Sequence, residues 1–282
     1  MDLDDLPDVA IHECIHYLQE KHDKKGRIIR LGLCDYTDKT LPGVGLNEAA
    51  VQLMAAKASG EPCENVKYFD INLKTNTPMY YPLECALVSQ MAYIVGEDVL
   101  FDSTLHSNSN FEAQYISLTS EEQFFKIQRN IDLLIEAQSK LENLYSSLED
   151  VGLEENFVQK ILKEIEETKT RVKKIFVVTQ RLILTSYFDN AIQLVFAPKA
   201  IENYRNKLYL FKNLVCYTEN DNFYTEYYRT KMEELEEKYE YKPSDVVTPL
   251  DLVLYKEGFF TKLFGKLKLL FRFNRGYERI QG

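Results

Sequence analysis

The spacing of apolar residues changes near residue 118, and this change divides the chain into two parts. Up to that point the apolar runs are short and are separated by glycine, proline and polar residues, as in a mixed α+β domain. We expect helices over about 4–24, 46–59 and 82–95, a strand over 27–34, one short strand within an irregular stretch at 65–79, and a polar loop over 103–110.

Beyond residue 118 the apolar residues recur at helical intervals. Ser120 and Gln123 fit a capping box that begins a helix. No glycine or proline lies between Gly152 and Pro198, which predicts one long helix there, and two more helices are expected over 200–215 and 222–239. The two long apolar stripes contain Ile127, Ile131, Leu134, Leu141 and Leu148, and then Ile161, Ile165, Thr168, Val172, Ile175, Thr179 and Leu182.

The second stripe alternates spacings of four and three residues, which is heptad-like. Packing between helices of the same chain is its simplest interpretation, and a coiled-coil dimer or a docking arm is the alternative. The predicted fold class is therefore mainly α. An α+β domain with a small sheet occupies residues 1–118, and an all-α, coiled-coil-like domain occupies residues 119–282. No internal repeat is apparent in the sequence.

Composition narrows the class of protein further. The chain has 282 residues, of which 45% are hydrophobic and 28% charged, as in soluble globular proteins. Its net charge of −10 disfavours binding to nucleic acid. Five scattered cysteines without a CxxC motif, an acidic start and no apolar run of membrane-spanning length predict a cytoplasmic protein.

The C-terminal segment 256–282 differs from the rest in its charge. It holds seven Lys or Arg residues against two acidic residues, a net charge of +5, and its Phe and Leu residues fall on one helical face. Such a segment could lie peripherally on an anionic membrane. The alternative is a terminal helix that packs on the helical domain with its basic face in solvent.

The stretch IHECIHYLQ carries the chemistry that stands out most. His12 and His16 are four residues apart, so on a helix both imidazoles point to one side and can bind one Zn²⁺ ion. Glu13 follows His12, where it can reach a water on the metal instead of joining the ligands. This is the H-E-x-x-H pattern of two ligands and a general base. A third protein ligand is still needed for a catalytic zinc site.

The run GLNEAAVQ supplies a carboxylate at the start of a second helix. With HECIH upstream, it resembles the gluzincins, the thermolysin-like zinc peptidases, over roughly residues 7–58. The resemblance implies that His12, His16 and Glu48 are the zinc ligands, that Glu13 is the base, and that Asn47 belongs to the site. Gln52 stands where this family often has an aspartate that supports a ligand histidine. Only eleven residues precede His12, so the sheet that comes before the motif helix in such peptidases is expected to be missing or to be supplied from later in the chain.

Two other residues are alternatives for the third ligand. His22 lies ten residues after His12, which is the metzincin spacing, but Gln19 stands where metzincins need a glycine. Asp35 would imitate the aspartate-ligand zincins, although the surrounding motif is absent. For stabilising the transition state, Tyr80, Tyr81, Tyr93 and His106 lie in the right part of the chain.

The sequence thus predicts a zincin-like domain that binds one Zn²⁺ ion and hydrolyses a peptide or protein substrate with metal-bound water and Glu13 as general base. The alternative is a non-catalytic helical scaffold or a membrane-associated interaction protein with a vestigial or structural metal site.

Overall fold

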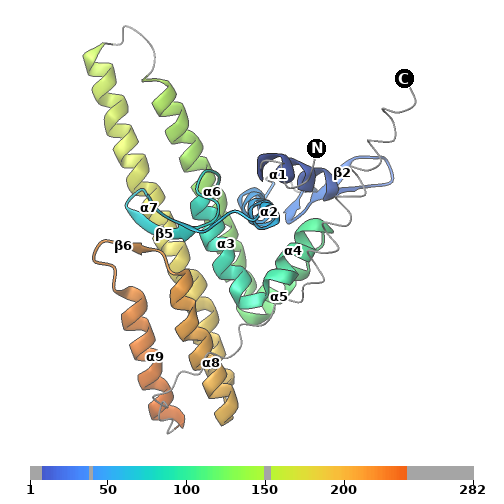
Figure 1. Cartoon of the computed structure of the whole chain (residues 1–282), viewed down its shortest axis with the longest axis vertical. Coiled ribbons are helices and arrows are strands. Elements are labelled where there is room, and N and C mark those ends of the chain that lie inside the picture. The colour runs from blue at the N-terminus through green and yellow to red at the C-terminus, as the bar shows by residue number, and fades with distance from the viewer. Residues whose placement is uncertain (1–7, 38–40, 149–153, 240–282) are drawn as a thin grey trace.

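The computed structural model describes residues 8–37, 41–148 and 154–239. Over these ranges the protein is mainly helical with two small three-stranded antiparallel sheets, which confirms the predicted fold class (Figure 1). The long helices α6 and α7 form one axis of the molecule. The N-terminal elements lie to one side of this axis, and α8 and α9 lie beside the C-terminal half of α7.

The first helix is shorter than predicted. Helix α1 spans Asp8–Leu18, and strand β1 (Glu20–His22) follows at once, so the expected continuation of the helix to about residue 24 is wrong. The Asp23 side chain accepts hydrogen bonds from the backbone N–H groups of Lys25 and Arg27, and Gly26 takes a φ of 75°. This turn closes a hairpin between β1 and the next strand, and the hairpin competes with the helix.

The strand expected over 27–34 is divided in two. β2 (Ile28–Leu31) and β3 (Cys34–Asp35) form an antiparallel sheet with β1 in the order β1-β2-β3. Gly32, with a φ of 56°, makes the turn between β2 and β3. Since this left-handed conformation costs glycine little, the glycine is the reason the strand breaks there.

Helix α2 (Val44–Ser59) lies at the centre of the N-terminal part. It buries ten of its 16 residues on several faces, mostly small or aliphatic ones, which is typical of a helix enclosed by other elements. It ends at Gly60, which adopts a left-handed conformation with its N–H donating to the Ala56 carbonyl. α2 packs against α1, α3 and α6.

Residues 64–75 form a hairpin where only one short strand was expected. β4 (Glu64–Tyr68) and β5 (Ile71–Thr75) pair in register, and the distant β6 (Tyr217–Thr218) adds to the other edge of β5. The turn residues Phe69 and Asp70 both have positive φ, of 49° and 60°. Two such residues in succession define the turn that suits a tight hairpin, but Phe is an unusual choice, so the sequence concealed it.

Three helices follow the second sheet. They are α3 (Pro82–Val95), α4 (Glu97–Leu105) and α5 (Asn110–Leu118). The polar loop predicted over 103–110 is therefore wrong in part: residues 106–109 connect α4 to α5 as expected, but α4 includes residues 103–105 and α5 begins at Asn110. Ser103 and Thr104 are fully buried and bonded, Ser103 to the backbone N–H of Phe111 and Thr104 to the Leu100 carbonyl. Serine and threonine are common in loops, which is why the sequence suggested a loop here. In the structure their hydroxyl groups form hydrogen bonds with backbone groups of the helices.

Helices α6 (Glu121–Ser146) and α7 (Glu155–Ala191) form the long hairpin that the two stripes predicted. Ser120 accepts a hydrogen bond from the Gln123 backbone N–H, as expected for the cap. The buried stripe of α7 includes the predicted positions Ile161, Ile165, Thr168, Val172 and Thr179, but Phe176 and Ile183 are buried instead of Ile175 and Leu182. A straight α-helix drifts relative to a strict heptad repeat, and this drift explains the change.

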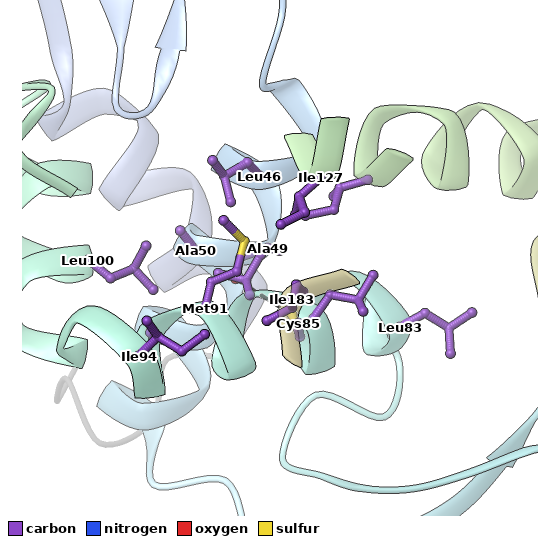
Figure 2. Packing of buried hydrophobic residues seen from close by; sticks show 14 of the residues in the cluster. Leu46, Ala49, Ala50, Leu83, Cys85, Met91, Ile94, Leu100, Ile127 and Ile183 are labelled. Carbon is purple, nitrogen blue, oxygen red and sulfur yellow. Dashed lines mark hydrogen bonds between the residues drawn. The ribbon is translucent and has the colours of Figure 1, made fainter. Parts of the chain in front are cut away.

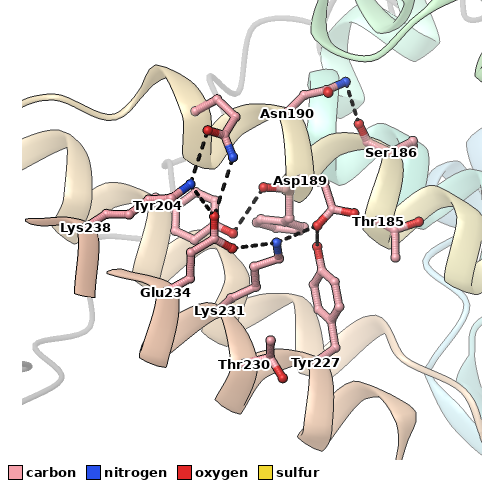
Figure 3. A network of polar contacts seen from close by, with 12 residues as sticks. Thr185, Ser186, Asp189, Asn190, Tyr204, Tyr227, Thr230, Lys231, Glu234 and Lys238 are labelled. Atoms are coloured by element: carbon pink, nitrogen blue, oxygen red, sulfur yellow. Dashed lines mark hydrogen bonds and ion pairs between the residues drawn. The ribbon is translucent and has the colours of Figure 1, made fainter. Parts of the chain in front are cut away.

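The C-terminal helices are anchored on α7 by a polar network. α8 (Pro198–Phe211) follows a short 3-10 turn, η2 (Ile192–Leu194), and α9 (Phe223–Tyr239) follows a second one, η3 (Lys212–Leu214). Asp189 of α7 pairs with Lys231 at 2.7 Å and accepts a hydrogen bond from the Tyr227 hydroxyl at 2.8 Å (Figure 3). Lys231 also pairs with Glu234 at 2.9 Å, which extends the network along α9.

One hydrophobic cluster runs through both predicted domains. Ala49 and Ala50 of α2, Met91 of α3, Ile127 of α6 and Ile183 of α7 all belong to it (Figure 2). The boundary near residue 118 stays a prediction. Among the described residues no helix is both long and apolar enough to cross a membrane. The amphipathic segment 256–282 lies outside the described residues.

Candidate metal centre

Helices α1 and α2 bring the candidate ligands together. His12 and His16 lie one turn apart on α1, while Glu48 and Gln52 lie one turn apart on α2. His12 contacts both residues of α2, and His16 contacts Glu48 alone, so the two helices run antiparallel at this point. Ile11 and Ile15 on the neighbouring face of α1 are buried in the core and fix the helix in this orientation.

The donor atoms of these three side chains converge. His12 Nε2 lies 3.3 Å from Glu48 Oε2, His16 Nε2 lies 3.4 Å from Glu48 Oε1, and the two Nε2 atoms are 2.9 Å apart. Ligands at ~2.0–2.1 Å from a tetrahedral ion would be ~3.3–3.4 Å from one another, so the distances to Glu48 match such an ion and the distance between the nitrogens is slightly short. Among the described residues this is the cluster of His, Cys, Asp and Glu that could hold a metal ion.

The other nitrogen of each imidazole is held by a glutamine. His12 Nδ1 lies 2.9 Å from Gln52 Oε1, and His16 Nδ1 lies 2.7 Å from Gln19 Oε1. A carbonyl oxygen can only accept, so each Nδ1 carries a proton. In a neutral imidazole Nε2 then presents a lone pair that a cation can bind, whereas in a protonated imidazole Nε2–H donates to the Glu48 carboxylate.

The ionisation of the cluster reflects this arrangement. Burial alone would raise the pKa of Glu48, but hydrogen bonds and charge from both histidines outweigh it and hold that pKa at about 2. Burial alone would lower the pKa of His16, yet Glu48, Gln19 and Glu13 raise it above its ordinary value. The carboxylate is therefore ionised at neutral pH, as a metal ligand must be.

The cluster is partly open to solvent. The side chain of His12 is 9% exposed, that of His16 17% and that of Glu48 21%. Glu13, the next residue along α1, is exposed, and its carboxylate contributes to the raised pKa of His16. A metal ion held by these three candidate ligands would therefore keep one side open for a further ligand.

Tyr81 forms another wall of the site. Its ring stacks on that of His12 with the centroids 6.4 Å apart, and burial together with the nearby Glu48 carboxylate raises the pKa of Tyr81 to about 12. Tyr81 precedes Pro82 at the start of α3 and has a φ of 52°, unusual for a residue with a large side chain. This conformation directs the phenol towards α1 and α2.

The remaining sequence candidates lie elsewhere. His22 is on strand β1 and pairs with Glu20, and Asp35 accepts hydrogen bonds from the backbone and hydroxyl of Thr37. Tyr93 donates to the Lys207 carbonyl at 3.0 Å and packs on Phe211, so it joins α3 to α8. His106, exposed at the end of α4, contacts Asp102 of the same helix.

Asn47 contacts Gln19, the residue that holds His16. It is buried next to Glu48, and its amide forms a reciprocal pair with the amide of Gln19, each N···O distance being 3.3 Å. Gln19 was considered in the sequence only as the residue that replaces a metzincin glycine. Its position three residues after His16, which places it beside that histidine, was the signal that could have indicated its role.

The comparisons with known proteins add no family. No protein-family model, no curated protein and no solved structure gives a significant match to this chain. The geometry of the described residues therefore carries the functional argument alone, and what it supports directly is a His-His-Glu group that could bind a metal ion.

Proposed function

We propose that this chain is a zinc-dependent metallopeptidase of the gluzincin type, in which His12, His16 and Glu48 hold one zinc ion and Glu13 is the general base. The observation that carries the proposal is the convergence of two Nε2 lone pairs and one carboxylate on the same point. Imidazole and carboxylate donors in this number suit zinc. The combination of HECIH with the downstream Asn-Glu-Ala run is what points to a peptide as substrate.

When bound, zinc supplies a Lewis acid for the substrate carbonyl and lowers the pKa of a water towards about 7. The carboxylate of Glu13 would accept a proton from the water that attacks the carbonyl carbon, and would return a proton to the amine as the C–N bond breaks. Glu13 is exposed and free to take and return this proton. The phenol of Tyr81, which lies beside His12 and Glu48 at the start of α3, would contact a bound substrate.

Metal content tests the ligand assignment. The purified protein, loaded with Zn²⁺ and dialysed, is expected to retain about one zinc per chain. His12→Ala and Glu48→Ala should each remove it, whereas His22→Ala and His106→Ala should leave it in place. Unchanged zinc in the Glu48→Ala protein would contradict the assignment, and loss of zinc in His22→Ala alone would favour the metzincin-like alternative.

Activity against a fluorogenic peptide library tests the base. Glu13→Gln should keep its zinc and lose at least ~100-fold in hydrolysis, since a positioned general base contributes that much. Glu61→Gln, an exposed glutamate beyond the end of α2, is the matched control and should keep both zinc and activity. A wild-type protein that binds zinc but hydrolyses no peptide would instead support the non-catalytic scaffold with a structural metal site.

A further inference from the structure

Both candidate histidines are supported by neutral amides. His12 Nδ1–H donates to Gln52 and His16 Nδ1–H donates to Gln19. Many metal sites use a carboxylate in this place, where its charge raises the basicity of the imidazole and strengthens its bond to the metal. Among the described residues neither Nδ1 atom contacts a carboxylate, so this source of metal affinity is absent from both histidines.

The orientation of Gln19 is fixed from its other end. Gln19 Nε2 donates to the Thr104 carbonyl at 3.2 Å, and a carbonyl oxygen cannot donate in return. Its partner Asn47 is fixed in the same way, because Asn47 Oδ1 accepts from the Leu33 backbone N–H at 3.0 Å. Turning the Gln19 amide over would place its oxygen against two other acceptors, the Thr104 carbonyl and Asn47 Oδ1. Gln19 therefore presents its oxygen to His16.

Burial makes this arrangement costly to change. Gln19 is 1% exposed, Asn47 2% and Gln52 1%, so water cannot readily replace a lost partner. A buried polar group left without its hydrogen bond costs about 1–3 kcal/mol. Gln19 consequently imposes the Nδ1–H tautomer on His16, and Gln52, whose Oε1 faces His12 Nδ1, favours the same tautomer in His12. In a neutral imidazole only that tautomer leaves Nε2 free to bind a cation.

We infer that Gln19 and Gln52 are positioning residues that fix the tautomer of both histidines and keep the affinity for zinc below the value that carboxylates would give. The inference rests on the proposed zinc site, but its first part concerns the metal-free protein and can be tested separately.

The tautomers can be read in the metal-free protein. The ¹⁵N shifts of labelled histidines, measured at about pH 9 where imidazoles are neutral, should show Nδ1–H for both His12 and His16. In Gln52→Leu the His12 signal should shift towards the Nε2–H form while His16 stays unchanged. Finding Nε2–H for both histidines in the wild-type protein overturns the inference, whether or not the protein binds zinc.

The affinity is measured by competition between the protein and a chelator of known zinc affinity. Gln52→Leu should weaken Zn²⁺ binding about 10- to 100-fold, and the isosteric Gln52→Glu should strengthen it about 10-fold or more. Gln90→Leu is the matched control. Gln90 is also fully buried, and its Nε2 donates to Gln180 Oε1 and to the Leu214 carbonyl, so its loss should destabilise the fold and leave zinc affinity unchanged.

The outcomes separate the two proposals. If Gln52→Leu and Gln52→Glu both bind Zn²⁺ with wild-type affinity, the inference is wrong although the zinc site stands. If no variant and no wild-type protein binds Zn²⁺, but the histidines show the Nδ1–H tautomer, the proposed function is wrong and the positioning role of the glutamines stands.

Discussion

Glu84 carries a carboxyl group in an environment that disfavours its charge. It lies in the first turn of α3 and is fully buried, and neither of its oxygens has a hydrogen-bond partner of normal geometry among the described residues. Burial raises the pKa of Glu84 to about 8, far more than a contact with its own backbone N–H lowers it. The group is therefore mainly protonated at neutral pH.

This raised pKa makes stability depend on pH. Between the ordinary glutamate pKa of about 4.3 and the folded value of about 8, the unfolded chain loses the proton and the folded chain keeps it, so the free energy of unfolding falls as the pH rises. Glu84→Met removes the titration and the unpartnered oxygens. We expect this variant to be more stable than the wild type by roughly 3 kcal/mol near pH 7, with a smaller gain at pH 4.

Urea unfolding of both proteins at pH 4, 6 and 8 measures the difference. Glu97→Gln, a change at a half-buried glutamate that pairs with Lys57, serves as the comparison and should not reproduce the pH trend. A gain in stability for Glu84→Met that stays the same at all three pH values would show that the folded protein does not hold the Glu84 proton.

At the scale of single residues, part of the candidate metal site was predictable from the sequence. His12 and His16 share a helix face by spacing alone, and the resemblance to gluzincins indicated Glu48 correctly as the acid that meets them. Tyr81 was one of three tyrosines named from the sequence, but it could not be preferred to Tyr80 or Tyr93, because its direction depends on a left-handed backbone at the residue before Pro82. The pairing of Gln19 with Asn47 depends on how α1 lies on α2, which no local pattern encodes.

At the scale of secondary-structure elements, the turn between β2 and β3 lies directly against the side-chain amides of Gln19 and Asn47. A Cβ atom at Gly32 would lie 2.0 Å from Asn47 Oδ1 and 2.2 Å from Gln19 Nε2. Gly32→Ala must therefore push the amide pair aside as well as strain a backbone with a φ of 56°. We expect a lower melting temperature and Zn²⁺ binding weaker by about 10-fold, since the support of His16 is displaced.

Gly26→Ala separates the effect of backbone strain from the effect of displacing the Gln19 and Asn47 amides. Gly26 has a similar φ of 75°, but nothing lies within 4 Å of the Cβ that alanine would add. This control should show a loss of stability from backbone strain alone and normal Zn²⁺ affinity in the same chelator competition. Equal zinc affinity in both alanine variants would mean that the Gln19 and Asn47 amides do not govern metal binding.

The start of α2 is held by a residue from another helix. Its N-cap, Gly43, offers no side chain, and Asp132 of α6 accepts hydrogen bonds from the backbone N–H groups of Gly43 at 2.9 Å and Gly45 at 2.8 Å. Asp132→Ala leaves both N–H groups unsatisfied, so we expect a loss of about 1–3 kcal/mol in the free energy of unfolding. Zinc affinity should fall too, because Glu48 lies in the next turn of α2.

Thermal unfolding and zinc competition on the Asp132→Ala protein measure both effects. Glu136→Ala, an exposed change one turn further along α6, is the control and should alter neither quantity. If Asp132→Ala unfolds at the wild-type temperature, the contact between α6 and α2 contributes nothing to the helix that carries Glu48.

Most of the helices were predictable because their apolar faces repeat with helical spacing and their ends carry glycine, proline or serine. The errors fall where a local signal was absent or was outweighed. α1 stops at Leu18 because the turn at Asp23–Gly26 forms a hairpin, and the hairpin at 64–75 turns through Phe69 and Asp70 without glycine. The cap from Asp132 joins residues almost 90 positions apart, and such contacts exist only once the chain has folded.

For the whole molecule, the main question is whether the two predicted domains unfold separately. The core does not divide at residue 118, since Met91 of α3 packs in the same cluster as Ile127 of α6 and Ile183 of α7 (Figure 2). α2 and α3 both pack against α6, and α3 also packs against α7. A continuous core of this kind predicts one cooperative transition, which differs from the two-step behaviour expected of independent domains.

The effect of zinc on the unfolding transition provides a further test of this prediction. An ion that binds only the folded state adds about 2.7 kcal/mol to the free energy of unfolding at a free concentration of 100 Kd. Because its ligands come from α1 and α2, and α2 is enclosed by the shared core, we expect Zn²⁺ to raise the midpoint of the entire transition. Calorimetry should give a calorimetric enthalpy equal to the van't Hoff enthalpy with and without zinc. Two transitions, of which zinc moves only one, would show instead that the domain carrying His12, His16 and Glu48 folds independently of the α6–α7 hairpin.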